Sequence, residues 1–349
     1  MKSSSEELFF DYLTDKFLKS RDVYLTDKPL RKSLLDEFSE KSDDKLNPIS
    51  EADLKDSLLE LWNQGIKHLN FPDGLFLCFI EMLEQIIYAL RDTGAMFTFS
   101  FTTSVKLLIR SQKYLTRLRQ LGLRRVTLNL VNSNQDVLNR YGINITASDQ
   151  FYAVQILQAL RFQVHLRYIL FEPLTTIDHL LNDYTFLEKN KLIGLYPYTD
   201  ILITYLELSP NTHFGEEYHN RRLYIPSADS NLPYQIFDKA AEEVLRWLSF
   251  YQFEYGSRWN YLHQLLLELR VKIAKSKPNW VVTNRGQELM YITLDLRKIP
   301  YDLFKALLSS AQEQRAITIT EFEIRRQCEE RFNQVESSYW EFRSSNIDH

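Results

Sequence analysis

The stretch LGLRRVTLNLVNSNQDVLNRYGINIT, Leu121–Thr146, carries the pattern from which the fold can be predicted. Its centre, RVTLNLV (125–131), is a short aliphatic and β-branched run, which predicts a buried strand. A polar turn follows, and then a helix is expected over 135–141, ending at a glycine. A strand followed by a turn and a helix is the repeating unit of parallel α/β folds.

The same alternation continues on both sides of this stretch. Strands are expected at 66–71, 96–102, 125–131, 162–171 and 200–208, and helices at 74–92, 104–121, 135–141, 148–160 and 176–190. A capped helix over 51–64, closed by Gly65, precedes them. Because the strands are largely apolar on both faces, we predict an α/β fold whose parallel sheet forms a partial or complete (β/α) barrel.

The chain divides into three regions. Residues 1–49 are a polar N-terminal segment whose one short strand candidate is 22–26, residues 50–210 hold the βα units, and residues 211–349 are mainly helical. In the last region we expect two helices broken near Gly256, a strand at Met290–Leu296, a helix over 300–311 and a terminal helix from about Thr320.

Composition excludes several classes of protein. The 349 residues are 44% hydrophobic and 25% charged, which is typical of a globular chain and excludes disorder and collagen. A formal net charge of −4 does not favour a nucleic-acid partner. No apolar run reaches the length of a membrane span, and the N-terminus has no secretory signal pattern. We therefore expect a cytoplasmic protein without a membrane partner.

Two cysteines, Cys78 and Cys328, are too few for a disulfide scaffold, a cysteine-only zinc site or a three-thiolate iron–sulfur site. Cys78 is expected to be buried in a helix and Cys328 to be exposed. His213 and His219 lie six apart in a loop-like stretch, a spacing that does not match the helical zinc motif, so no metal is expected.

Four segments, in order, resemble the radical S-adenosylmethionine enzymes, particularly their cobalamin-associated branch. They are GIKHLNFPDGLFL (65–77), the opening stretch with its polar turn, ALRFQVHLRYILFEPLTTIDHLLNDYTFLEKNKL (159–192) and YLELSPNTHFGEEY (205–218). The resemblance covers about 50–250 and implies a radical S-adenosylmethionine-type barrel with a mainly helical C-terminal extension.

The residues that carry chemistry in that family are missing. The family holds a 4Fe–4S cluster with three closely spaced cysteines, yet residues 20–48, where that loop should lie, contain none. The resemblance also places Val131 where the family has a glutamate that binds the cofactor's ribose, and an apolar side chain accepts no hydrogen bond. We therefore expect a degenerate barrel without a cluster, with residual S-adenosylmethionine binding left open.

Such a pseudoenzyme is expected to act as a non-catalytic binding or accessory subunit with a protein or peptide partner, in peptide or natural-product biosynthesis. This function is an analogy drawn from the fold. The alternative is a retooled enzyme that uses the barrel mouth without iron.

Ligands of βα folds bind where strands end, so polar residues there are site candidates. His165 and Arg167 share one face of a strand, and with Glu172 they could bind an anionic or amide-bearing ligand. Alternatively, they lie against helices, or Arg167 and Glu172 form an internal ion pair. The tentative ligand-binding residues are Asp73, Asn129, Asn132, His165, Arg167, Glu172 and Glu207, with Asn70, Ser100, Thr102 and Tyr205 nearby.

A second candidate surface is basic. The chain has no acidic residue from Thr93 to Gln135, and four basic residues there follow a 4, 3, 4 spacing that puts them on one stripe of a helix. This stripe could dock an acidic partner, or it could be an ordinary solvated face. Its residues are Lys106, Arg110, Lys113 and Arg117.

Overall fold

The computed structural model describes residues 20–22, 51–71, 84–85, 88, 91–92, 94–194, 198–206, 218, 234–276, 283–314 and 320–347. They fall into two compact units. The sheet unit holds the described residues up to Val131 together with Gln135–Arg167, and the helical unit holds Asn132–Asn134 and the described residues from Tyr168 onward. Cys78, Asp73, Glu207, His213 and His219 lie outside the described residues.

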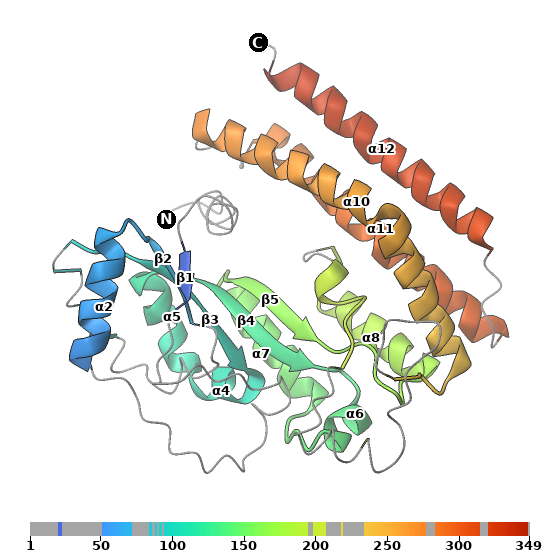
Figure 1. Ribbon diagram of the computed structural model, residues 1–349, viewed down its shortest axis with the longest axis horizontal. Helices are drawn as coiled ribbons and strands as arrows, with labels where there is room; N and C mark the ends of the chain where they lie inside the picture. Colours follow the sequence, from blue (N-terminus) through green and yellow to red (C-terminus); the bar gives the residue numbers. More distant parts are fainter. Residues whose placement is uncertain are drawn as a thin grey trace. The chain divides into compact units, whose positions relative to one another are not determined.

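The sheet unit is built on five strands in the order β1-β2-β3-β4-β5 (Figure 1). The pairs β1–β2, β2–β3 and β3–β4 are parallel, and the arrow of β5 points the same way as that of β4. The strands are β1 (Ser20–Asp22), β2 (His68–Phe71), β3 (Thr98–Ser104), β4 (Leu123–Val131) and β5 (Gln163–Tyr168). This arrangement confirms the predicted α/β fold with a parallel sheet.

Helices of the sheet unit follow the strands as the sequence predicts. They are α2 (Glu51–Asn63), α4 (Val105–Arg110), α5 (Gln112–Leu121), α6 (Gln135–Arg140) and α7 (Ala147–Ala159). The helix expected over 104–121 is two helices that meet at Ser111, whose backbone N–H still donates to carbonyls of α4. Ser104 and Thr146 cap α4 and α7 with their hydroxyls.

Alternation along the strands gives the sheet two different faces. Arg124 donates from Nη1 to the carbonyl oxygen of Arg119 in α5 at 3.0 Å, so the face of β4 that holds Arg124 and Val126 is turned toward the helices. Buried apolar residues of this face include Phe99, Phe101 and Leu128. The alternate residues of each strand, which lie between these in the sequence, therefore point to the opposite face of the sheet.

The helical unit consists of α8 (Ile177–Lys189), the short helix η3 (Tyr198–Asp200), α10 (Lys239–Ser276), α11 (Asn284–Gln314) and α12 (Glu321–Ile347). The last three are long helices that pack on one another (Figure 1). Arg258 of α10 joins α12 by hydrogen bonds of 2.7–3.0 Å to Glu329, Asn333 and Glu336. The mainly helical C-terminal region is thus confirmed.

Two predictions for this region are wrong. Met290–Leu296 lies inside α11, because Leu289, Ile292 and Leu296 form a buried stripe at helical spacing that extends beyond the short apolar run. Gly256 does not break a helix, since α10 continues through it and buries Tyr255 and Trp259 on either side.

Two smaller expectations also need correction. The described part of 200–208 forms no regular strand, only an isolated parallel bridge between Phe171 and Tyr205, and its buried Ile201 and Leu202 explain the apolar run. Cys328 was expected to be exposed, but its side chain is buried in α12, with 3% exposure.

No helix among the described residues is long and apolar enough to cross a membrane.

Gly122 closes α5 and lets β4 begin beside β3. Its φ of 129° lies outside the range that L side chains adopt readily, and a Cβ there would overlap the carbonyl oxygen of Phe97. Its own carbonyl oxygen accepts from Phe99 N at 3.1 Å. The turn and the β3–β4 register thus depend on a residue without a side chain.

Gly122→Ala is expected to lower the free energy of unfolding by about 2–4 kcal/mol, because backbone strain adds to a steric overlap with main chain. Gly142→Ala is the control, since Gly142 has a φ of 66° but open space around the missing Cβ. The control is expected to cost about 1–2 kcal/mol. Urea unfolding measures both, and equal losses would contradict the steric role of Gly122.

Candidate functional site

The face of the sheet turned away from the helices is polar, and we call it the polar face. Register places Asn70 beside Ser100, and Ser100 beside Arg125. Arg125 donates from Nε to Gln163 Oε1 at 2.9 Å, which extends the row to β5. The polar face comprises His68, Asn70, Thr98, Ser100, Thr102, Arg125, Thr127, Asn129, Gln163, His165 and Arg167.

His68 is the most enclosed titratable group of this face, being 2% exposed. Its ring nitrogens lie 3.0 Å from Thr98 Oγ1 and 3.0 Å from Ser100 Oγ. Burial, assisted by the charge of Arg125, lowers the pKa of His68 to about 3. The imidazole is therefore neutral at physiological pH and serves as a hydrogen-bonding group.

The neighbours of His68 determine which nitrogen carries its proton. The Ser100 hydroxyl donates to Asn70 Oδ1 at 2.8 Å, so it accepts from Nε2 of His68. A neutral ring protonated on Nε2 must accept at Nδ1, from the hydroxyl of Thr98. The other acceptor near that hydroxyl, Lys67 O, is more distant at 3.3 Å. The result is a directional chain of hydrogen bonds that crosses β2 and β3.

His165 and Arg167 occupy the polar face, as the contact of Gln163 with Arg125 fixes the side of β5 that faces this way. His165 Nε2 lies 3.5 Å from Gln163 Nε2, and Arg167 is exposed. Asn129, a further predicted ligand residue, is fully buried on the same face. The strands therefore place three of the predicted site residues on one face of the sheet.

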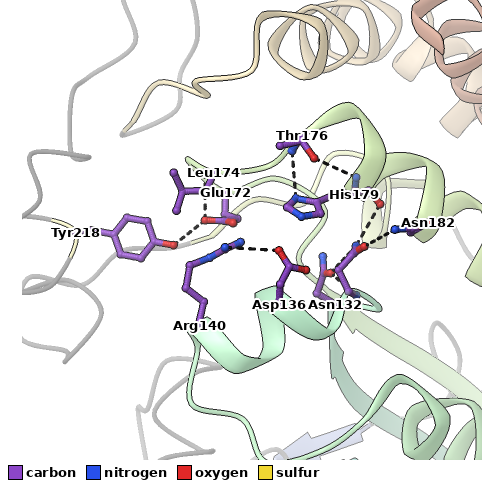
Figure 2. A network of polar contacts seen from close by, with 10 residues as sticks. Asn132, Asp136, Arg140, Glu172, Leu174, Thr176, His179, Asn182 and Tyr218 are labelled. Carbon is purple, nitrogen blue, oxygen red and sulfur yellow. Dashed lines mark hydrogen bonds and ion pairs between the residues drawn. The ribbon is translucent and has the colours of Figure 1, made fainter.

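Glu172 and Asn132 belong to the helical unit instead. Glu172 is 1% exposed, and its Oε2 accepts from the Tyr218 hydroxyl at 2.6 Å and from Leu174 N at 3.3 Å (Figure 2). The Thr175 hydroxyl accepts from Glu172 N at 2.9 Å. This carboxylate organises the loop that enters α8, a role distinct from that of Arg167 on the polar face.

The turn after β4 binds a buried carboxylate. Ser133 approaches Asp183 Oδ1 with both its hydroxyl, at 2.5 Å, and its backbone N–H, at 3.3 Å. Asn134 Nδ2 donates to the same oxygen at 3.0 Å, and the hydroxyl of Tyr168 also donates to it. Asn132 Nδ2 reaches Asp183 Oδ2 at 3.4 Å. We call these five residues the Asp183 cluster.

Neighbouring contacts hold the Asp183 cluster against the start of α8. Asn182 Nδ2 donates to Asn134 Oδ1 at 3.1 Å, and Asn134 Nδ2 also donates to the carbonyl oxygen of His179 at 3.1 Å. His179 in turn accepts from Thr176 N at 3.2 Å and completes the helix cap (Figure 2). The polar groups of the turn are thus used within the protein.

Val131 precedes this turn with a φ of 69°, a conformation that a β-branched residue adopts only under strain. Such strain costs about 1–3 kcal/mol and persists where surrounding contacts impose it. Asn132 supplies one such contact, since its Nδ2 donates to Ile169 O at 2.8 Å. Val131 itself is fully buried.

Sequence reasoning missed His68, Tyr168 and Asp183. A signal for Asp183 was present, because it lies between Leu180 and Leu187 at spacings of three and four on the buried stripe of α8. A carboxylate on a buried stripe needs several donors. Three of those donor residues, Asn132, Ser133 and Asn134, lie in the polar turn predicted from the sequence, and the fourth, Tyr168, ends β5.

A 4Fe–4S cluster does not fit the residues present. Three thiolates are needed, whereas the chain has two cysteines, and burial raises the pKa of the Cys328 thiol to about 12. Within the described ranges, no group of three or more His, Cys, Asp or Glu residues is placed to hold a metal ion. Val131 offers no acceptor for a ribose hydroxyl.

The Asp183 cluster makes stability depend on pH. Burial raises the pKa of Asp183 to about 6, although the donors from Ser133 and Tyr168 oppose the rise. The folded protein therefore keeps this proton up to a higher pH than the unfolded chain. Protonation of Asp183 therefore adds to the free energy of unfolding. This stabilisation is fully present below the pKa that Asp183 has in the unfolded chain, and it is lost as the pH rises through about 6.

Asp183→Asn is expected to remove this dependence, which amounts to about 3 kcal/mol for a shift of about two pK units. The free energy of unfolding, measured by urea titration at several pH values between 4 and 7, is the readout. Asp178→Asn is the matched control, because Asp178 is an exposed acid in the first turn of the same helix. If the Asp183 variant keeps the wild-type pH profile, the assignment is wrong.

No protein-family model matches the sequence, and no curated protein matches it. Solved structures do match. The cobalamin-dependent S-adenosylmethionine radical enzyme OxsB with aqua-cobalamin bound aligns with a TM-score of 0.62 at 14% identity, over 94% of this chain and 55% of that chain. Selenomethionine-labelled apo OxsB aligns with a TM-score of 0.54 at 15% identity, over 94% and 60%.

The chain thus spans little more than half the length of the structures it matches. At this level of identity the similarity shows the fold alone and carries no information about activity. The alignment covers the α/β part and the helical region together. The chain therefore has the radical S-adenosylmethionine-like fold that its four sequence segments predict.

Proposed function

We propose that this protein is a cluster-free relative of the radical S-adenosylmethionine fold that acts as a non-catalytic binding or accessory subunit in peptide or natural-product biosynthesis. One observation carries the proposal most directly. The turn after β4, to which the sequence resemblance assigns the cofactor's ribose, has a valine in place of the acid and directs its side chains to Asp183.

The donor sets support the same proposal. An iron–sulfur cluster needs thiolates, and the two cysteines of this chain, Cys78 and Cys328, lie 250 positions apart. The matched structures are of the cobalamin-dependent enzyme OxsB, which is considerably longer than this chain. We do not expect cobalamin or S-adenosylmethionine to support radical chemistry here.

The polar face supports a binding role. Arg125, His165 and Arg167 supply donors on one face of the sheet, and neutral His68 adds a hydrogen-bonded neighbour. Guanidinium groups and imidazoles suit carboxylate or amide groups. A peptide or an amino-acid-derived intermediate has this chemistry.

Anaerobic reconstitution with iron and sulfide is expected to yield no stoichiometric cluster and no cleavage of S-adenosylmethionine, since the thiolates are missing. Iron and sulfide analysis and chromatography of the nucleoside product measure the outcome, with a cluster-containing radical enzyme as the positive control. Calorimetry with S-adenosylmethionine is expected to show no heat of binding. Uptake of about four iron atoms with cofactor cleavage would overturn the proposal.

A retooled enzyme is the second candidate, favoured by the placement of His165 and Arg167 on one face. Complementation of a host strain that lacks the protein separates the two. If the chain is an accessory subunit, Arg167 contributes affinity alone, so overproduction of the Arg167→Ala protein is expected to restore product formation. Loss of product that overproduction does not restore, with the exposed control Arg161→Ala unaffected, would favour catalysis on the polar face. Metabolite profiling and a thermal unfolding curve are the measurements.

A further inference from the structure

A groove of about 760 Å³ lies in the sheet unit between the α4–α5 pair and α7. Its apolar lining includes Ile109 of α4 and Ile156 of α7. Gln112 of α5 and Tyr152 of α7 also line it, and the Tyr152 hydroxyl donates to Gln112 Oε1 at 3.0 Å. This hydrogen bond joins the two walls, so the groove is formed before any partner arrives.

The charge of the groove is positive. Arg110 and Lys113 are the charged residues that line it, and both side chains are exposed. The surrounding sequence contains no acid from Thr93 to Gln135. On the facing helix, the nearest acid toward the N-terminus, Asp149, is used in the capping box with Thr146.

Arg117 is not part of this surface, although sequence spacing placed it on the same stripe. Its Nε lies 3.0 Å from Glu84 Oε1, and its guanidinium lies over the ring of Tyr88. The predicted stripe of four basic residues is therefore divided: Arg110 and Lys113 line the groove, Lys106 is not among its lining residues, and Arg117 is engaged in an ion pair.

We propose that this groove docks an acidic, aliphatic segment of a partner protein, with carboxylates at Arg110 and Lys113 and an aliphatic side chain over Ile109 and Ile156. The proposal deepens the proposed accessory function and rests on it. Charge complementarity selects the partner's chemistry, and the tyrosine at the groove supplies an anchor typical of protein interfaces.

A protein suits the groove better than a nucleic acid does. Two basic side chains neutralise few phosphates, so the electrostatic gain from a polyanion is small. The aliphatic lining offers a phosphate neither a hydrogen bond nor a charge, whereas leucine-like side chains of a partner protein would bury apolar area there.

The full chain is titrated with a fluorescein-labelled peptide of repeating Glu-Glu-Leu triplets, and fluorescence anisotropy measures the affinity. The double variant Arg110→Glu/Lys113→Glu is expected to bind it about tenfold or more weakly, which corresponds to about 1.4 kcal/mol. Raised salt should weaken the wild-type complex. The charge-matched control Lys189→Glu/Arg326→Glu, which reverses two exposed residues of the helical unit, should retain wild-type affinity within twofold.

Several outcomes would overturn the docking proposal. If a peptide with glutamine in place of glutamate binds equally well, recognition does not depend on charge. If the Arg110→Glu/Lys113→Glu variant binds the acidic peptide as tightly as the wild type, the peptide does not bind in this groove. An oligonucleotide that binds more tightly through Arg110 and Lys113 would assign the groove to nucleic acid. A dimer in sedimentation that the double variant dissociates would assign it to a second copy.

Thermal unfolding of each variant shows whether it is folded, and Arg110→Gln/Lys113→Gln provides a milder version if charge reversal unfolds the sheet unit. Iron uptake and cofactor cleavage are measured independently of the peptide. Failure of the groove test therefore leaves the proposed function standing, whereas cluster chemistry with normal peptide binding would overturn the function alone.

Discussion

The buried carboxylate of Asp183 is the constraint on which the organisation of the turn after β4 depends. A carboxylate in an apolar interior is tolerated only when several donors surround it. Ser133, Asn134 and Tyr168 supply donors to one of its oxygens, and Asn132 reaches the other. Removing any one partner leaves a polar group buried without full compensation, so the turn and α8 are fixed together.

The same constraint relates the fold to its proposed function. The polar groups of a turn can bind a ligand or other groups of the same protein. In this turn, the side chains of Asn132, Ser133 and Asn134 bind Asp183. The polar face of the sheet differs, because Arg167 is exposed and Arg125 is half-buried. Recognition of another molecule is therefore expected to use the sheet face and the helix surface of the sheet unit.

Much of the fold could be predicted because the strand and helix periods are strong in the α/β part. The strands at 66–71 and 125–131 follow directly from short apolar runs, which the observed β2 and β4 match closely. The prediction of a strand at Met290–Leu296 was wrong, because an apolar run of seven residues does not distinguish a strand from part of a long buried helix. The Asp183 cluster depends on residues about 50 positions apart, and local pattern does not report such contacts.

The strained Val131 and the inward turn have an evolutionary consequence. An acid at position 131 alone would bring a second carboxylate to the residue next to Asn132, while the turn's donors stay bound to Asp183. Loss of Asp183 alone would leave those donors buried without an acceptor, at a cost of about 1–3 kcal/mol for each. Each single step is unfavourable, so the two changes are epistatic. An acid at position 131 is therefore expected to be tolerated only together with a change at Asp183.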